Sequence, residues 1–439
     1  INSASINSKK INKNSIFIGV KGKKFDGNLY AHEAAKNGAI LALSNKKSKN
    51  SKIIFQQNPL KFFSKMSSAY RKSLNANNIA ITGSAGKTSV KELVGFCLSK
   101  LSKTYFSKNS FNNKYGVPLS IFNMPPESKF AVLEVGMDKK GEIDNLTKIT
   151  KPDLGIITNI SYAHSKNFKN IKQIADAKAE IMNNIKREGA VILNKDDRFY
   201  EYHKNLALKK KIKVISFGIK NKSAMVKLIK IKKKINGYEL FVGVNDVYTS
   251  FYSHNDNKSH VYNILATLAS INLFIDIKKF KKDIFLNMKT PIGRGDFSKI
   301  KFKNKNFFLI DESYNSNPLS LKTAIENYDK IDSKNSKKYL ILGDMLELGK
   351  HSLKQHKLIS KILNRTKIDH VYVIGKYIKE TFKGLKPNKK AKILANKFDI
   401  IDLINKDLNN NDYLMIKGSN STGLHKITNK LKQSIAHAI

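Results

Sequence analysis

The chain has 439 residues, 41% of them hydrophobic, and a formal net charge of +47 from 81 Lys and Arg against 34 Asp and Glu. This length predicts roughly two to four domains. The lysines are spread along the whole chain without the aromatic and basic clusters of an RNA-binding module, so we interpret them as solvated faces that also attract phosphate-bearing substrates. The single cysteine, Cys97, excludes a disulfide framework and favours a reducing, cytoplasmic compartment.

The chain shows no targeting or membrane signal. Its first residues, INSASINSKKINKN, are polar and unlike a signal peptide, and no apolar run reaches transmembrane length. Because the sequence opens with Ile rather than Met, we expect a few residues to precede it. We expect no nucleic-acid partner and no membrane insertion, and we take a monomer as the default.

The first 77 residues are expected to form a small N-terminal α/β domain. Strands are predicted at SIFIGV and AILALS, with a helix at AHEAAKNGA between them. The polar stretch RKSLNANN, residues 71–78, is interpreted as a linker to the next domain.

Residues 78–288 alternate strands with helices, which predicts a central domain with a parallel sheet covered on both faces. The predicted strands are NIAIT, FAVLEVG, DLGIITNI and AVILN, and the predicted helices are SVKELVGFCLSKL, IKQIADAKAEIMNNI and NILATLASINLFI. The lysine-rich segment 225–244 is predicted to form a half-exposed hairpin that turns at Asn236-Gly237.

Residues 289–439 alternate strands and helices once more. Strands are predicted at FFLIDE, KKYLILGDM, HVYVIGK and DYLMIKG. This pattern predicts a second, smaller Rossmann-like domain. The expected fold class is therefore α/β with three domains.

The segment AITGSAGKTSVKEL, residues 80–93, joins a predicted strand to a predicted helix through a glycine-rich turn. Its glycines let the backbone approach an anion, and the helix start directs its positive end toward that anion. Lys87 can reach the outer phosphates of ATP, and the Thr88 hydroxyl can bind Mg²⁺. The usual earlier glycine is absent, because Ile81 holds its place. We predict a shortened phosphate-binding loop made of Gly83, Ser84, Ala85, Gly86, Lys87, Thr88 and Ser89.

Three further polar residues follow predicted strands or lie in the next helix. Glu134 ends a strand next to the phosphate loop, where a carboxylate can hold the magnesium that Thr88 contacts. His164 lies just past another strand end, and a structural, hydrogen-bonded histidine is the alternative to a metal ligand there. Lys178 lies in a predicted helix, where a surface lysine is the simpler interpretation in so basic a chain.

The ordered motifs ITGSAGKTSVKE, SFNNKYGVPLS, LEVGMDKKGEI, TNISYAH and IADAKAEI resemble the Mur ligases, the ATP-dependent amide ligases of peptidoglycan assembly. DESYNSNPLSL, LGDMLELG and IKGSNSTGLHKI are similar to the member that adds D-alanyl-D-alanine to UDP-N-acetylmuramoyl tripeptide. The resemblance covers essentially the whole chain. It implies that the γ-phosphoryl group of ATP moves to the acceptor carboxylate and that the amine then attacks the acyl phosphate.

The resemblance also implies roles for the catalytic and metal-binding residues. Thr88 and Glu134 would hold a first Mg²⁺, and His164 a second one. Lys178 matches the family's carbamylated lysine, whose carbamate oxygens would face metal. The residues implied in catalysis are Lys87, Lys178, His164 and Arg294.

Further contacts with the nucleotide and the substrates are implied in the same way. The residues implied near the nucleotide, besides the phosphate loop, are His260, Asn263, Arg294, Asp311 and Asn315. The N-terminal domain resembles the UDP-binding domain and would use Ser8, Phe25, Asp26 and Gly27. Asn112 and Asn113 would line the substrate cleft, and Asp344, Lys417 and Ser419 would face the incoming dipeptide.

The chain departs from the family pattern at a few positions. Asn7 and Lys9 replace an acidic residue and an arginine beside Ser8, and Lys139 stands where histidine is common. Asn420 replaces an expected arginine and His425 an expected acidic residue. These positions concern the UDP end and the dipeptide carboxylate rather than the phosphate chemistry.

Three alternatives remain at this point. One is a sibling ligase that adds a single amino acid. Another is a basic, nucleic-acid-dependent P-loop ATPase, which the absence of aromatic-basic clusters disfavours. The third is an ATP-binding protein that has lost catalysis, for which Asn420 is the only hint.

Overall fold

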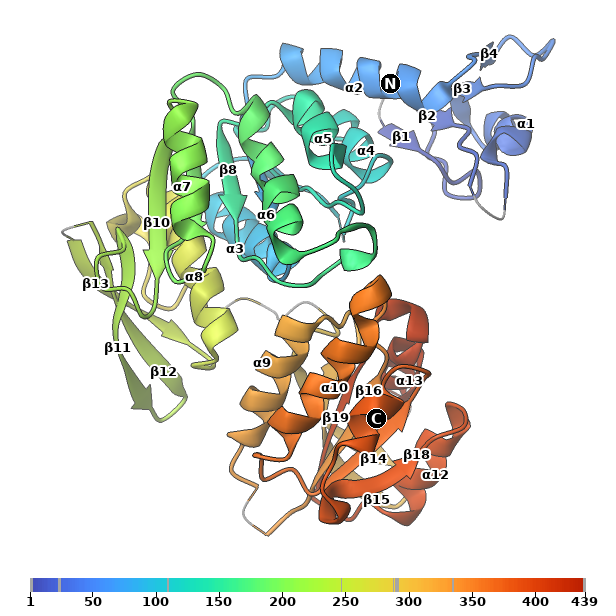
Figure 1. Cartoon of the computed structure of the whole chain (residues 1–439). Helices are drawn as coiled ribbons and strands as arrows, with labels where there is room; N and C mark the ends of the chain where they lie inside the picture. Colours follow the sequence, from blue (N-terminus) through green and yellow to red (C-terminus); the bar gives the residue numbers. More distant parts are fainter. Residues whose placement is uncertain are drawn as a thin grey trace. The chain divides into compact units, whose positions relative to one another are not determined.

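The computed structural model describes residues 3–22, 25–108, 110–245, 247–286, 288, 292–333 and 335–436. The chain forms two compact units. The first contains Ile1–Asn159, Ala175–His254 and Tyr262–Leu286, and the second contains Ile160–Ile174, Asn255–Val261 and Asn287–Ile439. Three sheets rich in parallel strands run through them, as the α/β prediction requires (Figure 1). The domain boundaries at 77/78 and 288/289 stay predictions.

The N-terminal sheet has four parallel strands in the order β1-β2-β3-β4. Its elements are β1 (Ser3–Ser5), β2 (Ser15–Ile18), η1 (Gly27–Tyr30), α1 (Ala31–Lys36), β3 (Ala39–Ser44), β4 (Ile53–Phe55) and the following helix α2 (Pro59–Ser73). Ile16 and Phe63 share one core cluster with Leu119 of α4 (Gly116–Phe122). The N-terminal sheet and the next sheet's helices are therefore packed into one core.

The linker prediction for residues 71–78 is wrong. Arg71 and Ser73 belong to the last turn of α2, and β5 already begins at Asn77. Arg71 is buried despite its charge. Only Lys72 and Ser73 lie on the exposed side of the helix, whose other side, with Phe63, is in the core.

The central sheet has nine strands in the order β13-β12-β11-β10-β9-β8-β5-β7-β6. Its parallel strands are β5 (Asn77–Thr82), β6 (Thr104–Phe106), β7 (Phe130–Glu134), β8 (Leu154–Ile157), β9 (Ala190–Asn194) and β10 (Lys213–Gly218). The sheet continues with β11 (Val226–Lys234), which is parallel to β10, and with β12 (Gly237–Val244) and β13 (Val247–Ser253) in antiparallel pairs. The connecting helices are α3 (Lys87–Ser99), α4, α5 (Glu142–Thr150), η2 (Ser165–Asn167), α6 (Ile171–Ala179), η3 (Glu180–Asn184), α7 (Tyr200–Lys209), α8 (Lys258–Ile271) and η4 (Ile277–Lys279).

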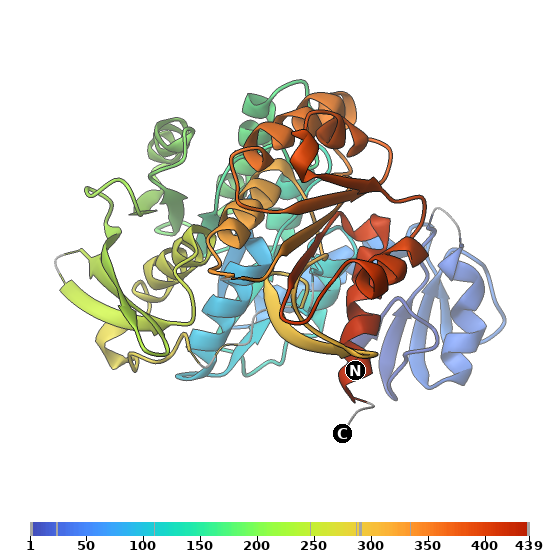
Figure 2. The same cartoon turned by 90° about the horizontal axis from the view of Figure 1, so that it is seen from below.

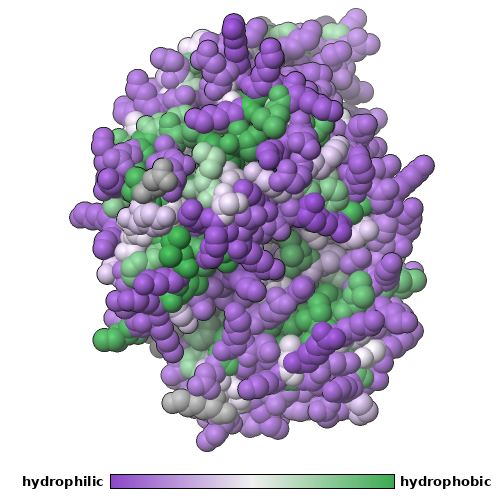
Figure 3. Space-filling view, turned by 60° about the vertical axis from the view of Figure 1, so that its left-hand side comes forward, coloured by the Kyte–Doolittle hydropathy of each residue, from purple (hydrophilic) through white to green (hydrophobic). Residues whose placement is uncertain are grey.

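The predicted hairpin is present, but its turn lies one residue earlier. Lys234 pairs with Gly237, so the turn residues are Ile235 and Asn236. Gly237 begins β12 with a φ of 132°, which an L-residue rarely adopts. The outer lysines of β11 are exposed, and the face in Figure 3 is largely hydrophilic, as expected for solvated lysine.

The C-terminal sheet has six strands in the order β14-β15-β19-β16-β17-β18, and only the β14–β15 pair is antiparallel. Its strands are β14 (Asp296–Phe302), β15 (Lys305–Glu312), β16 (Lys338–Gly343), β17 (His370–Ile374), β18 (Lys390–Ile393) and β19 (Tyr413–Lys417). Its helices are α9 (Pro318–Asp329), η5 (Gly349–His351), α10 (Ser352–Leu363), α11 (Lys379–Lys383), η6 (Pro387–Lys389), α12 (Phe398–Lys406), η7 (Asn420–Thr422) and α13 (Leu424–Ala436).

The helices of this unit cover both faces of its sheet (Figures 1 and 2). Leu340 and Leu342 of β16 pack in a cluster with α9 and α10. Their neighbours Tyr339 and Ile341 point to the other face and pack in a cluster with α12 and α13. Strand β16 leads into α10 and the adjacent strand β19 into α13, so the chain leaves these two strands toward opposite faces. Such a switch point is where open α/β sheets bind ligands.

Several lysines in this unit act as structural donors. Lys305 Nζ donates to the carbonyls of Ile404, Asn405 and Leu408 at the end of α12. Lys389 Nζ donates to Ile368 O at 2.8 Å, in the segment between α10 and β17. Positive side chains near the carbonyl end of a helix are stabilising. Within the described residues, no helix is long and apolar enough to cross a bilayer.

The core shared by the N-terminal and central sheets gives a prediction. Phe63 is 1% exposed and its ring lies 5.3 Å from that of Phe122. Phe63→Ala is expected to lower the free energy of unfolding of the first unit by about 3–5 kcal/mol, because it leaves a cavity. Phe62→Ala is the control, since Phe62 is 38% exposed, and should cost at most about 1 kcal/mol. Urea unfolding followed by circular dichroism measures both, and equal losses would contradict the shared core.

Candidate functional site

The predicted strand, glycine-rich turn and helix are all present around residues 80–93. Strand β5 ends at Thr82 and α3 begins at Lys87. Gly83 and Gly86 have φ angles of 147° and 83°. A Cβ built on Gly83 would lie 1.8 Å from Thr158 Oγ1, and one built on Gly86 would lie 2.8 Å from Asn263 Oδ1. Both positions therefore require glycine, for conformation and for space.

The loop is held against the end of the neighbouring strand β8. Ser84 N donates to Asn159 O at 2.9 Å, and Ala85 N donates to Asn159 Oδ1 at 3.0 Å. Thr158 Oγ1 donates to Ala85 O at 2.6 Å. Sequence reasoning assigned no role to Thr158 or Asn159. The available signal was their place at the carboxyl end of a predicted strand, as the first two residues of the TNISYAH motif.

Lys87 and the start of α3 supply positive charge to this loop. Lys87 Nζ donates to Gly83 O at 2.9 Å, so the ammonium lies across the turn. The first backbone N–H groups of a helix carry partial positive charge and bind anions. The arrangement can hold a chain of phosphates, as the sequence predicts.

Thr88, in the first turn of α3, and Glu134, at the end of β7, lie next to each other beside the phosphate loop. Thr88 Oγ1 donates to Glu134 Oε2 at 2.7 Å, and Asn112 Nδ2 donates to Glu134 Oε1, also at 2.7 Å. Glu134 is 1% exposed and Thr88 is 7% exposed. A hydroxyl and a carboxylate are the oxygen ligands that Mg²⁺ prefers, so these residues fit a magnesium ion.

Asn113 has a different place from Asn112. Its Oδ1 accepts hydrogen bonds from the backbone N–H groups of Tyr115 and Gly116, both at 3.0 Å. These bonds shape the start of α4, where the side chain acts as a local cap. The structure thus brings Asn112, but not the amide of Asn113, to Glu134.

Lys178 is buried on α6, with 1% of its surface exposed. None of the described residues forms an ion pair or a hydrogen bond with its Nζ. Burial, and then the positive charge of Lys87, lower the pKa of Lys178 well below its ordinary value. Lys91 is also buried, but its Nζ donates to Ser107 O and pairs with Glu92. Lys178 therefore differs from the structural lysines, because its amine is pushed toward the neutral, nucleophilic form.

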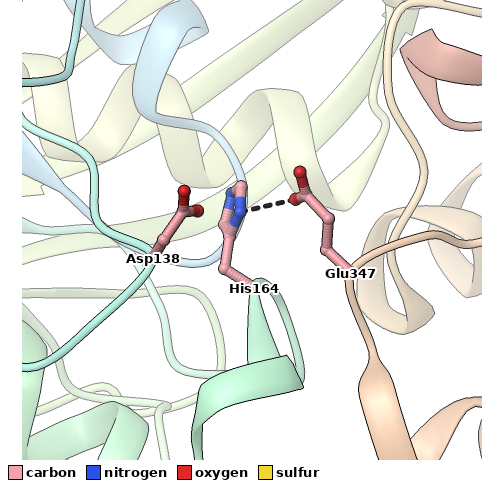
Figure 4. Close-up of side chains that lie close together, drawn as sticks. All are labelled: Asp138, His164 and Glu347. Carbon is pink, nitrogen blue, oxygen red and sulfur yellow. Dashed lines mark ion pairs between the residues drawn. The ribbon is translucent and has the colours of Figure 1, made fainter. Parts of the chain in front are cut away.

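His164 lies in the second unit, in the segment after β8. It adopts a left-handed conformation with a φ of 51°, and its Nδ1 lies 2.6 Å from Glu347 Oε2 (Figure 4). Lys166 N donates to Glu347 O at 2.9 Å, and Ser165 Oγ donates to Leu348 O at 3.2 Å. Asp138, which Figure 4 also labels, belongs to the first unit. Glu347 belongs to the GDMLELG motif, but the sequence predicted no role for it.

Arg294 lies beside the end of β15 in the second unit. Its guanidinium stacks over the ring of Tyr314, 4.6 Å from the centroid. Gly295 N donates to Asp311 O at 2.9 Å and Tyr314 N donates to Gly293 O at 3.1 Å, so the two loops are joined. The structure brings together the predicted residues Arg294 and Asp311 in this way.

Asp311 and Lys417 are both buried and bound within the unit. Asp311 Oδ1 accepts from Ser313 N at 3.0 Å, and its Oδ2 lies 2.6 Å from Lys432 Nζ. Lys417 Nζ lies 3.1 Å from Glu312 Oε2 and also donates to the carbonyl of the exposed residue Asn315. These contacts fix the carboxyl ends of β15 and β19 side by side.

Asp344 and Ser419 join the loops after β16 and β19. The Asp344 carboxylate accepts from the backbone N–H groups of Lys376, Tyr377 and Ile378, at 2.9, 2.9 and 2.8 Å. Ser419 N donates to Asp344 O at 3.1 Å. The Asp344 carboxylate thus fixes the backbone of residues 376–378, at the switch point where a ligand crevice is expected.

The residues predicted near the UDP group lie in the segments that follow β1 and β2 of the N-terminal sheet. Ser8 Oγ donates to Glu33 Oε2 at 3.0 Å. Asp26 accepts from the side chain and the backbone of Asn28, which lowers the pKa of Asp26. A Cβ on Gly27 would lie 2.7 Å from Val20 O, while Phe25 is 72% exposed. His260 lies near the start of α8, three residues before Asn263.

Two protein families match the chain. The Mur ligase middle domain matches residues 81–271, and the family described as Mur ligase, glutamate ligase domain, matches residues 297–420. Together they cover the phosphate loop, Glu134, Lys178 and most of the C-terminal sheet.

Curated relatives match over nearly the full length. A UDP-N-acetylmuramoyl-tripeptide–D-alanyl-D-alanine ligase from Buchnera aphidicola subsp. Baizongia pistaciae is 32% identical over 98% of this chain and 92% of its own. Proteins of the same name from Rickettsia prowazekii and Bacillus subtilis are 31% and 27% identical, over 97% and 99% of this chain and 94% of each relative.

Solved structures share the fold. A MurF crystal structure from Acinetobacter baumannii has a TM-score of 0.86, with 24% identity over 98% of this chain and 93% of that one. The MurF ligase from Thermotoga maritima in complex with ADP has a TM-score of 0.82, with 22% identity over 100% and 99% of the two chains.

The geometry of the loop gives a second prediction. Gly83→Ala places a methyl group on Thr158, so ADP binding measured by calorimetry should weaken at least about tenfold, which is about 1.4 kcal/mol. Gly141→Ala is the control, because Gly141 also has a positive φ of 87° but nothing lies within 4 Å of its added Cβ. The control should bind ADP like the unchanged protein. Equal weakening in both variants would contradict a specific effect of the contact with Thr158.

Proposed function

The chain belongs to the Mur ligase family, and we propose that it joins D-alanyl-D-alanine to UDP-N-acetylmuramoyl tripeptide with consumption of ATP. The observation that carries the proposal is the full-length similarity to relatives of that name, with the phosphate loop, Glu134 and Lys178 all inside the range that matches the Mur ligase middle domain. The reaction forms an amide bond in the assembly of peptidoglycan precursors.

The reaction needs activation because a carboxylate is a poor electrophile. Its oxygen takes the γ-phosphoryl group of ATP, and ADP departs. The amine lone pair then attacks the acyl carbon, the phosphate leaves with the former carboxylate oxygen, and the amine loses a proton. Lys87 and the start of α3 would neutralise charge on the phosphates during the transfer.

Magnesium fits the residues below the loop. Thr88 and Glu134 would hold it, and Asn112 orients the Glu134 carboxylate through its 2.7 Å hydrogen bond. His164 would hold a second magnesium. Bound Mg²⁺ supplies charge neutralisation at the phosphate oxygens.

Lys178 fits the carbamate role. A neutral amine reacts with carbon dioxide, forming an N–C bond and losing a proton, and the product is an anionic carbamate. The buried position of Lys178 and its lowered pKa favour that neutral amine. The carbamate oxygens would then offer negative charge toward metal, where an ammonium would repel it.

The proposal also includes the three-domain division, a cytoplasmic location and a monomer. Asp344, Lys417 and Ser419 would serve the dipeptide side, and the N-terminal sheet would serve the UDP side.

A sibling ligase that adds one amino acid is the nearest alternative. A nucleic-acid-dependent ATPase would instead be stimulated by polynucleotide and inhibited steeply by salt.

An amine panel tests the proposed reaction. The purified protein is given UDP-N-acetylmuramoyl tripeptide, ATP and Mg²⁺ with D-alanyl-D-alanine or with single amino acids. Release of inorganic phosphate is expected with D-alanyl-D-alanine only. The matching shorter UDP precursors are offered in parallel with their own amino acids. Release with a single amino acid, and none with D-alanyl-D-alanine, would overturn the proposal in favour of a sibling ligase.

A second experiment tests Lys178. Lys178→Ala should reduce turnover by about 100-fold or more while ADP binding persists, because a group that helps to hold metal is lost. Lys172→Ala, on the exposed side of the same helix, is the matched control and should keep its activity. Short carboxylic acids should partly restore turnover to Lys178→Ala. Unchanged turnover in Lys178→Ala would contradict the proposed carbamate role of Lys178.

A further inference from the structure

Both ring nitrogens of His356 have defined partners. The residue lies on α10 and is 0% exposed. Its Nδ1 lies 2.7 Å from Ser352 O, and its Nε2 lies 3.0 Å from Met345 N. A carbonyl oxygen only accepts and a backbone N–H only donates, so Nδ1 must carry the proton and Nε2 must offer its lone pair. The geometry admits one tautomer of the neutral ring.

The bond to Met345 joins α10 to the amine-side loop, which we define as residues 344–348. The loop has other attachments on either side of this bond. Asp344 is fixed through its carboxylate, and Leu346 N donates to Ser419 Oγ at 2.9 Å. His356 is the acceptor for the backbone N–H between them. Loss of this acceptor would leave the buried N–H of Met345 without a partner. The free-energy cost is larger than that of losing a hydrogen bond at the surface, where water replaces the partner.

The amine-side loop lies where the second unit is expected to bind a ligand. It follows β16, and residues 418–423 follow the adjacent strand β19. The chain leaves these strands toward α10 and α13 on opposite faces of the sheet. A crevice opens at such a point, at the carboxyl ends of the strands. Ser419 joins the two loops there.

We infer that His356 is a positioning residue that holds the amine-side loop in its substrate-binding form through Met345, and that it does so only as a neutral imidazole. This inference rests on the proposed function, because it assigns the loop to the D-alanyl-D-alanine side. Protonation of Nε2 would replace an acceptor by a donor facing the Met345 N–H. The loop would then lose its attachment to α10.

The surroundings of His356 keep the ring neutral. Burial lowers the pKa of His356, and the bond to Ser352 and the charge of Asp344 act in the opposite direction with smaller effect. Asp344 at the end of β16 and Tyr377 before α11, with its ring 5.9 Å away, are the titratable groups that face the ring. Lys357 on α10 and Lys322 on α9 are exposed, and Glu380 on α11 pairs with Lys383. Because the pKa is lowered, attachment of the loop persists at neutral pH and is lost only below about pH 6.5, the ordinary value for histidine.

Two substitutions test the hydrogen bonds of the two His356 ring nitrogens separately. His356→Gln places an amide oxygen near the position of Nε2 and can accept from Met345, without a group that titrates. His356→Asn places an amide nitrogen near the position of Nδ1 and keeps only the bond to Ser352. Each variant therefore loses one buried hydrogen bond, so their thermal unfolding midpoints should be similar.

The readout is steady-state phosphate release with D-alanyl-D-alanine and the tripeptide precursor. His356→Asn should raise the KM for D-alanyl-D-alanine by about tenfold or more, with kcat and the KM for ATP changed by less than about threefold. His356→Gln should keep the KM for the amine within about threefold of the unchanged protein. Equal KM values in the two variants, or an equal rise in the KM for ATP, would overturn the inference.

A pH series on the folded proteins gives the second arm. The ratio of the amine KM of the unchanged protein to that of His356→Gln should rise below about pH 6.5, since protonation of the substrate amine affects both alike. Because the pKa of His356 is lowered, a rise in this ratio that already occurs between pH 8 and pH 6.5 would overturn the inference, even if His356→Asn does not fold. Absence of turnover with D-alanyl-D-alanine in the unchanged protein would instead overturn the proposed function itself.

Discussion

A buried carboxylate at the end of a strand is the feature on which the nucleotide side of this protein depends. Glu134 is 1% exposed, and the two side chains that reach it, Thr88 and Asn112, are neutral donors. No described residue forms an ion pair with it. A buried carboxylate without a cationic partner is costly, and binding a metal cation offsets that cost. Glu134, at the end of β7, therefore presents its negative charge beside the phosphate loop, where a cation can be bound.

Lys178 presents the same energetic problem as Glu134, because it is a buried group whose charged form lacks a partner of opposite charge in the described part of the chain. It is buried without a partner among the described residues, and its pKa is lowered. Most other buried lysines have a structural bond, such as that of Lys389 to Ile368 O. In a chain with 81 Lys and Arg residues, it is this lack of a partner, and not the presence of a lysine, that marks Lys178. Its burial is the main cause of its lowered pKa.

The strands with continuous apolar runs could be predicted from the sequence, including β3, β5 and β9. Short edge strands such as β6 and β18 could not, because they owe their conformation to pairing with a neighbour. The phosphate loop was predictable because its residues are contiguous. Thr158, Glu347 and His356 were not, because their roles come from contacts with residues distant in the sequence. The burial of Lys178 could likewise not be predicted from its own helix, and only the family resemblance gave this residue a role.

The central claim is that the terminal phosphoryl group of a nucleotide held by the Gly83–Thr88 loop is transferred to a carboxylate of the acceptor. Labelling that carboxylate with ¹⁸O and analysing the released phosphate by mass spectrometry tests it most directly. The account predicts one labelled oxygen in each phosphate released, because the acyl–oxygen bond breaks when the amine attacks. Phosphate that contains no label, released together with amide product, would contradict the account.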